Sequence, residues 1–153
     1  MADLKLTAYR DGTDLELIGV DLVSIDGFQN MPLLGLYGGN FEESTKVFNL
    51  AELRSDWWGN EMLDFDNPSV QMNSKLERTL INTALNSAGR IEIEETVKKD
   101  LEFMTTFGDL EVTVSIVDVD RISIYIKITE PSNEESNEFT FIWNATEKEL
   151  KEI

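Results

Sequence analysis

Apolar and polar residues alternate most regularly near the C-terminal end of the chain, where every second residue from 122 to 128 is isoleucine. A period of two is typical of a β-strand with one buried face. The pattern predicts three strands, at residues 110–117, 121–129 and 138–144, joined as an antiparallel sheet. The residues that follow, 145–152, are expected to form a short helix or a loose tail.

A helical period precedes the sheet. Ser74 and Glu77 have the spacing of a capping box, and apolar residues then recur on one helical face as far as Ala88. Gly89 is expected just beyond the end of this helix. A second amphipathic helix is predicted from about residue 92 to 107, with Glu94 and Glu95 each four residues before a lysine.

The N-terminal part holds short extended segments separated by turn residues. Strands are predicted at residues 3–9, 15–18 and 20–25. A short helix is expected at residues 30–38, with Asn30 as its cap and Pro32 in its first turn.

Together these patterns predict a single α+β domain. Its parts are an N-terminal β-hairpin region with a short helix (1–39), an extended loop (40–72), two central amphipathic helices (73–108), a C-terminal three-stranded antiparallel sheet (109–145) and a tail (146–153).

The extended loop contains adjacent tryptophans, Trp57 and Trp58, followed by Gly59. Neighbouring side chains point in different directions on a strand or a helix, so both indoles do not easily enter one core. One reading is an irregular loop held to the domain by two large anchors; the other is contact with a partner, for which tryptophan is a favoured residue. A loop of this length inside a small domain usually has a function or is ordered by a partner.

Composition excludes several classes of function. The chain has 13 basic and 30 acidic residues, a formal net charge of −17, which repels nucleic acids and anionic membrane surfaces. It has no cysteine, so disulfides and thiolate metal sites are absent, and no histidine, the usual general base and commonest zinc ligand. The N-terminus lacks the pattern of a signal peptide, and no apolar run is long enough for a membrane span.

A metal site would have to consist of oxygen ligands alone. Residues 64–67 (Asp-Phe-Asp-Asn) lack the glycine and the distant glutamate of a calcium loop, so a capped turn before Pro68 is the better interpretation. Asp118 and Asp120 flank a predicted hairpin turn, to which the same interpretation applies. We therefore expect no catalytic residue, no cofactor and no metal, and a protein that is not an enzyme.

Three segments together resemble a known family. They are the hairpin-like stretch 14–28, which ends at Asp26-Gly27, the apolar segment Leu33–Tyr37, and the tract Ser55-Asp56-Trp57-Trp58-Gly59. With two helices and a strand-rich end after them, the chain resembles, over about residues 3 to 145, the Mu-like baseplate wedge proteins of contractile-tailed phages. That group is related to the sheath-initiator wedge family. The Glu-Pro-Arg motif associated with the sheath initiators is replaced here by the stretch 107–111 (Phe-Gly-Asp-Leu-Glu).

The resemblance implies a structural subunit of a phage or tailocin tail baseplate, assembled in the host cytoplasm and present in several copies in a symmetric ring. Its implied partners are other wedge proteins, the tail-tube hub and sheath subunits. The expected partner-binding residues are Trp57, Trp58 and Gly59 in the loop and Phe139, Phe141 and Trp143 in the last predicted strand. An exposed edge of that strand would accept a strand from a partner. The alternative is a small acidic inhibitor, of the immunity type, that binds a basic toxin.

Overall fold

The fold combines short N-terminal hairpins, helices and a C-terminal sheet, so the predicted α+β class is confirmed. The computed structural model describes residues 2–9, 12–18, 21–22, 24–38, 74–131 and 136–153. In chain order its elements are β1 (Ala2–Leu4), β2 (Leu6–Tyr9), β3 (Gly12–Leu15), β4 (Leu17–Ile18), β5 (Asp21–Leu22), β6 (Ser24–Asp26), the 3-10 helix η1 (Gly27–Asn30), α1 (Met31–Tyr37), α3 (Leu76–Asn82), α4 (Ser87–Asp100), the 3-10 helix η3 (Glu102–Thr106), β7 (Asp109–Asp118), β8 (Arg121–Thr129), β9 (Ser136–Asn144) and β10 (Glu149–Glu152).

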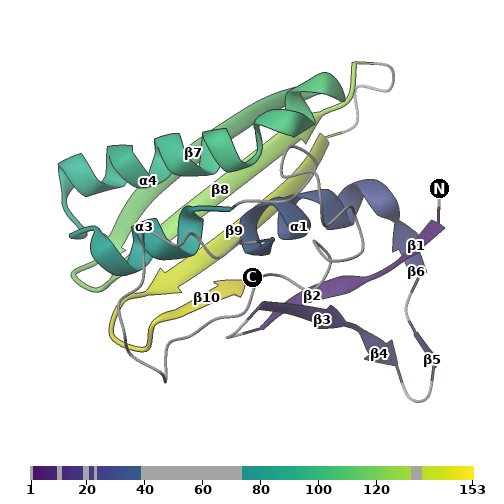
Figure 1. Ribbon diagram of the computed structural model, residues 1–153, viewed down its shortest axis with the longest axis horizontal. Helices are drawn as coiled ribbons and strands as arrows, with labels where there is room; N and C mark the ends of the chain where they lie inside the picture. Colours follow the sequence, from purple (N-terminus) through teal and green to yellow (C-terminus); the bar gives the residue numbers. More distant parts are fainter. Residues whose placement is uncertain (1, 10–11, 19–20, 23, 39–73, 132–135) are drawn as a thin grey trace, which may run out of the picture.

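The C-terminal strands form an antiparallel sheet of four strands in the order β10-β9-β8-β7 (Figure 1). The three predicted strands are confirmed as β7, β8 and β9, but the prediction of a three-stranded sheet is wrong by one strand. Residues 149–152, expected in a helix or a loose tail, form β10 and pair with β9. Leu150 of this strand lies opposite Trp143 and is buried, which explains why so short a segment joins the sheet.

The core lies between one face of the sheet and the helices α1, α3 and α4 (Figure 1). The alternating isoleucines of β8 are fully buried, as their spacing predicts. Ile126 lies opposite Val112 of β7 and Phe139 of β9 in the register. The three strands therefore present their apolar side chains on the same, core-facing side of the sheet. The opposite face of β8 carries Ser123, Tyr125, Lys127 and Thr129.

The two central helices are confirmed, with different boundaries. α3 ends early, because Thr83 has an extended backbone (φ −103°, ψ 131°). Gly89, predicted to lie just beyond this helix, is instead in the first turn of α4. The side chain of Asn86 caps α4 by accepting hydrogen bonds from the N–H groups of Ala88 and Gly89, both at 3.0 Å. In the described ranges, no helix is long and apolar enough to cross a membrane.

Ser74 helps to cap α3, since its hydroxyl accepts a hydrogen bond from the Leu76 N–H at 3.4 Å, but a distant carboxylate is the stronger cap. Asp100, at the end of α4, accepts hydrogen bonds from the N–H groups of Lys75 (2.8 Å) and Leu76 (2.9 Å). The Ser74 hydroxyl lies 3.0 Å from the same carboxylate oxygen. A carboxylate at a helix N-terminus satisfies backbone donors that have no partner within the helix. The cap therefore also ties α3 to the end of α4.

The N-terminal region forms three small pairs of strands, β1 with β6, β2 with β3 and β4 with β5. The predicted helix at residues 30–38 is confirmed as α1, with Pro32 in its first turn. Asn30 occupies the predicted N-cap position, but its side chain makes no capping hydrogen bond to α1. Its buried amide instead bridges strands, accepting from the Leu6 N–H at 3.0 Å and donating to the Leu4 carbonyl at 2.6 Å.

Candidate protein-interaction surfaces

The aromatic residues of β9 lie in the core. Phe139, Phe141 and Trp143 are 8%, 0% and 3% exposed. β9 is also not an edge strand, since β8 and β10 pair with it on either side. The expectation of unpaired backbone at residues 138–144 is therefore wrong. A partner-binding role for the three aromatic side chains stays a prediction.

Trp57, Trp58 and Gly59 lie outside the described residues, as does the rest of the loop 40–72. Their predicted partner-binding role stays a prediction. The turn interpretation of residues 64–67 falls in the same segment and is equally untested.

The free edge of β7 is occupied at its middle by two side chains of α4. Arg90 donates a hydrogen bond to the Val114 carbonyl at 3.2 Å, and the Glu94 carboxylate accepts one from the Val114 N–H at 3.4 Å. Arg90 and Glu94 also pair with each other at 3.1 Å. The hydrogen bond from Lys98 at 2.7 Å is the largest cause that holds the pKa of Glu94 below its ordinary value. The carboxylate is thus charged at neutral pH and suited to accept from backbone.

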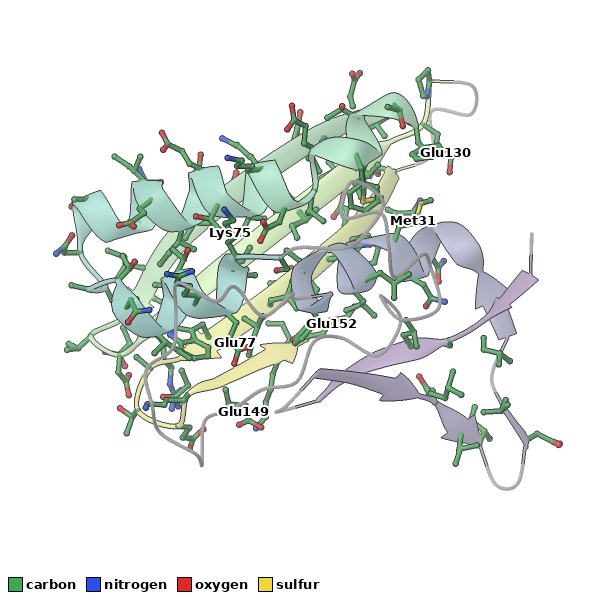
Figure 2. All side chains as sticks on the ribbon, viewed as in Figure 1. Met31, Lys75, Glu77, Glu130, Glu149 and Glu152 are labelled. Carbon is green, nitrogen blue, oxygen red and sulfur yellow. The ribbon has the colours of Figure 1, made fainter. Side chains whose placement is uncertain are left out.

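The outer edge of β10 lies against β2, and one side chain of α1 contacts it. The Tyr37 hydroxyl donates to the Leu150 carbonyl at 3.3 Å, and burial raises the pKa of this tyrosine well above its ordinary value. Glu152, opposite Phe141 in the register, lies on the core-facing side of β10 near α1 (Figure 2). Glu152 is exposed, and a charged side chain on an edge strand disfavours the addition of another strand. Both edges of the described sheet are therefore protected by side chains.

The N-terminal hairpin β4–β5 exposes large apolar side chains. Leu17, Ile18 and Leu22 are 62%, 69% and 45% exposed. Figure 1 shows this hairpin at the far end of the N-terminal region, away from the C-terminal sheet. We call residues 15–18 and 21–22 the apolar arm. The sequence predicted these strands but not the exposure of their apolar side chains. Alternating apolar and polar residues predict that one face of a strand is buried, but not whether it is buried in its own domain or against another protein.

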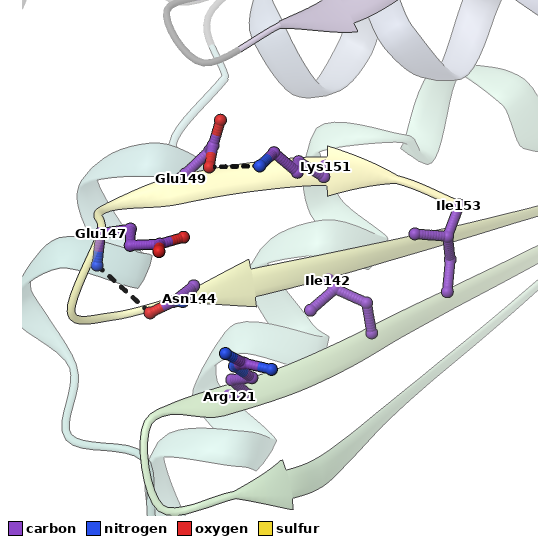
Figure 3. Close-up of a pocket in the computed structure, with 7 residues that line it drawn as sticks. All are labelled: Arg121, Ile142, Asn144, Glu147, Glu149, Lys151 and Ile153. Atoms are coloured by element: carbon purple, nitrogen blue, oxygen red, sulfur yellow. Dashed lines mark hydrogen bonds and ion pairs between the residues drawn. The ribbon is translucent and has the colours of Figure 1, made fainter.

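A shallow hollow of about 260 Å³ lies on the other face of the sheet (Figure 3). Its lining combines opposite charges with apolar groups, and comprises Arg121, Ile142, Asn144, Glu147, Glu149, Lys151 and Ile153. Lys151 and Glu149 pair at 2.7 Å, and Glu147 donates its backbone N–H to the Asn144 side chain at 3.2 Å. Two basic and two acidic side chains line the hollow, so it offers no concentrated charge of either sign.

The carboxylates of the β7–β8 turn serve as local hydrogen-bond acceptors. Asp118 accepts from the Val119 N–H at 2.7 Å, and Asp120 accepts from the Thr146 hydroxyl at 2.9 Å. The turn interpretation of this aspartate pair is confirmed. Among the residues that the structure describes, no group of three or more acidic side chains is placed to hold a metal ion.

No protein family, curated protein or solved structure matches this chain. The resemblance to Mu-like baseplate wedge proteins therefore depends on the residues of the sequence that carry it.

Proposed function

We propose that this chain is a structural subunit of the baseplate wedge of a contractile tail, where it joins the baseplate to the tube and sheath through contacts with other proteins. The hairpin-like stretch 14–28, the segment Leu33–Tyr37 and the Trp-Trp-Gly tract support the family resemblance. The observation that carries the proposal is the apolar arm. Contiguous apolar surface in water is costly and is typical of a protein that binds another.

The division of the molecule suits this role. The sheet and helices form a body with a continuous apolar core, and its sheet edges are protected at Val114 and Leu150. The arm extends from that body. A subunit built in this way binds neighbours through the arm and through the Trp-Trp-Gly loop, while its own sheet stays intact. In the proposed setting it acts through contacts, not catalysis, in several copies around the tail axis.

The competing hypothesis is an acidic inhibitor of a basic toxin. Such an inhibitor would concentrate acidic residues on one face. In this chain the acidic residues are spread along the sequence from Asp3 to Glu152. The apolar arm is also unexplained by this alternative. We therefore favour the baseplate role.

Co-purification with contractile tails tests the proposal. An epitope-tagged copy of the chain is expressed in cells that carry its gene cluster, and intact tails are isolated by density gradient. We expect the chain to co-sediment with tube and sheath subunits in a fixed stoichiometry, and purified chain to bind isolated tube or sheath subunits in size-exclusion with light scattering. Absence from intact tails, or stable one-to-one capture of a basic nuclease, would reject it.

A further inference from the structure

The apolar arm presents a continuous stripe that begins at the body of the protein. Leu17 and Leu22 lie directly opposite each other in the β4–β5 pairing, so their side chains share one face. Leu15, two residues before Leu17, lies opposite Leu6 of β2, and Leu6 packs against the core. The stripe therefore continues the apolar surface of the body outward, from Leu6 through Leu15 to the tip.

The tip has little to stabilise it within the described chain. β4 and β5 have two residues each, and a two-stranded hairpin of this size is marginal in water without packing on one face. The face that would pack carries Leu17 and Leu22, and Ile18 on the other face is 69% exposed. Burial of these side chains against a partner supplies the missing apolar contact.

Charge identifies the kind of partner. Residues 12–26 contain Asp14, Glu16, Asp21 and Asp26 and no lysine or arginine, and of these acids Glu16 pairs with Lys5 at 2.7 Å. Asp21 is exposed and lies opposite Ile18, next to the apolar stripe. A second copy of this chain, with its own net charge of −17, is a poor match because like charges would meet at the contact. An apolar groove bordered by lysine or arginine is complementary in both respects.

We propose that the apolar arm inserts its Leu17–Leu22 face into an apolar groove with a basic rim on a different protein of the same particle. This inference rests on the proposed baseplate function and adds the surface used and the chemistry of the partner. The leucines supply the buried contact, and Asp21, next to Leu22 in the chain but on the other face of the hairpin, lies at the border of that contact, where a basic rim can reach it. The contact is therefore expected to weaken with added salt, since rim charges in water are screened.

Complementation of a gene deletion tests the surface. The variants are Leu17→Ser/Leu22→Ser on the arm and Ile91→Ser/Val119→Ser as a matched control. Ile91 and Val119 are 49% and 91% exposed on α4 and in the β7–β8 turn, so the control also removes two exposed apolar side chains. We expect the arm variant to enter tails at least tenfold less than the unchanged chain, and the control to enter normally. Circular dichroism and thermal unfolding establish that both variants are folded.

The outcomes separate this inference from the proposed function. If the unchanged chain is absent from tails, the baseplate function fails. If the unchanged chain and the arm variant enter tails equally, the function stands and the arm inference is overturned.

A photo-crosslinking amino acid at Leu17, on the face that enters the groove, then reports the partner. A crosslink in intact tails to an apolar site flanked by lysine or arginine supports the proposal, and Asp21→Lys should reduce its yield. A crosslink to another copy of this chain, or to a site without basic residues nearby, overturns it.

Discussion

The Glu94 carboxylate on α4 accepts a hydrogen bond from the backbone N–H of Val114, at the middle of the edge strand β7. Arg90 donates to the carbonyl of the same residue, so both outward backbone groups of Val114 are engaged. Residues along one edge of an antiparallel strand direct these groups outward in alternation. A strand that paired with β7 would need the backbone N–H and carbonyl of Val114 as hydrogen-bond partners. It would have to displace the Arg90 and Glu94 side chains to reach them. The helix thus protects the edge of the sheet that it covers.

Removal of this pair should promote self-association. The Arg90→Ala/Glu94→Ala variant frees the Val114 backbone groups without changing net charge. We expect a concentration-dependent dimer by sedimentation velocity, because an unprotected edge strand pairs with another. The loss of unfolding free energy should be modest, about 1–2 kcal/mol, since the pair is partly exposed.

The matched control is Glu95→Ala/Lys99→Ala, which removes two exposed residues of opposite charge from the same helix with the same spacing. The control should sediment as the unchanged chain does. Equal association of both variants, or of neither, would rule out a protective role for Arg90 and Glu94.

The alternation in β8 was sufficient to predict its buried face, because a period of two can bury only one side of a strand. β10 was not predictable in this way. It has four residues, and its pairing depends on Trp143 of β9, on the Tyr37 hydroxyl and on the burial of Leu150, which are contacts between distant parts of the chain.

The boundary between the two central helices is a second feature that the sequence did not predict correctly. Apolar residues continue at helical spacing past Leu80, although α3 ends two residues later. Gly89 is typical of a residue that follows a helix, yet it lies in α4 because the chain passes close to it. A side chain at this position would collide with the Ala84 carbonyl oxygen and lie 2.7 Å from the Thr83 methyl group. Only the folded structure shows this approach.

Gly89→Ala should therefore destabilise the protein. In an open helix this change is favourable by about 1 kcal/mol, because alanine loses less backbone entropy than glycine. Here the collision with backbone at Ala84 outweighs that gain, and we expect a loss of about 1–3 kcal/mol in urea unfolding. The control is Ala88→Gly, one residue earlier and exposed, which should cost about 0.5–1 kcal/mol by propensity alone. A stabilised Gly89→Ala variant would contradict the close approach.

Folding stability should increase as the pH falls from 7 toward 5. Burial raises the pKa of Asp100, partly offset by its hydrogen bonds from Lys75, Ser74 and Leu76, and burial also raises the pKa of Glu152. A carboxyl with the higher pKa in the folded state binds protons more readily there than in the unfolded chain. Its protonation therefore favours folding as the pH falls through the folded pKa toward the unfolded one.

Urea unfolding at constant ionic strength measures this dependence, with Asp100→Asn/Glu152→Gln as the test variant. The variant should show a smaller rise in unfolding free energy than the unchanged chain; the rise that remains comes from relief of the overall negative charge. Glu94, whose pKa is lowered, acts in the opposite direction and limits the gain at lower pH. Identical slopes for the two proteins would show that neither carboxyl has the raised pKa.

Substitution of Trp143 should distinguish packing from partner binding. Its indole is 3% exposed, it lies between Ile122 and Leu150 in the register, and its buried Nε1 has no hydrogen-bond partner among the described residues. Trp143→Phe removes the unpaired N–H and keeps an aromatic ring, so the lost contact and the relieved polar group should nearly cancel, within about 1 kcal/mol. Trp143→Ala should cost about 3–5 kcal/mol. If the role is packing, the phenylalanine variant also enters tails normally; a stable variant that fails to enter them would instead establish Trp143 as a partner contact.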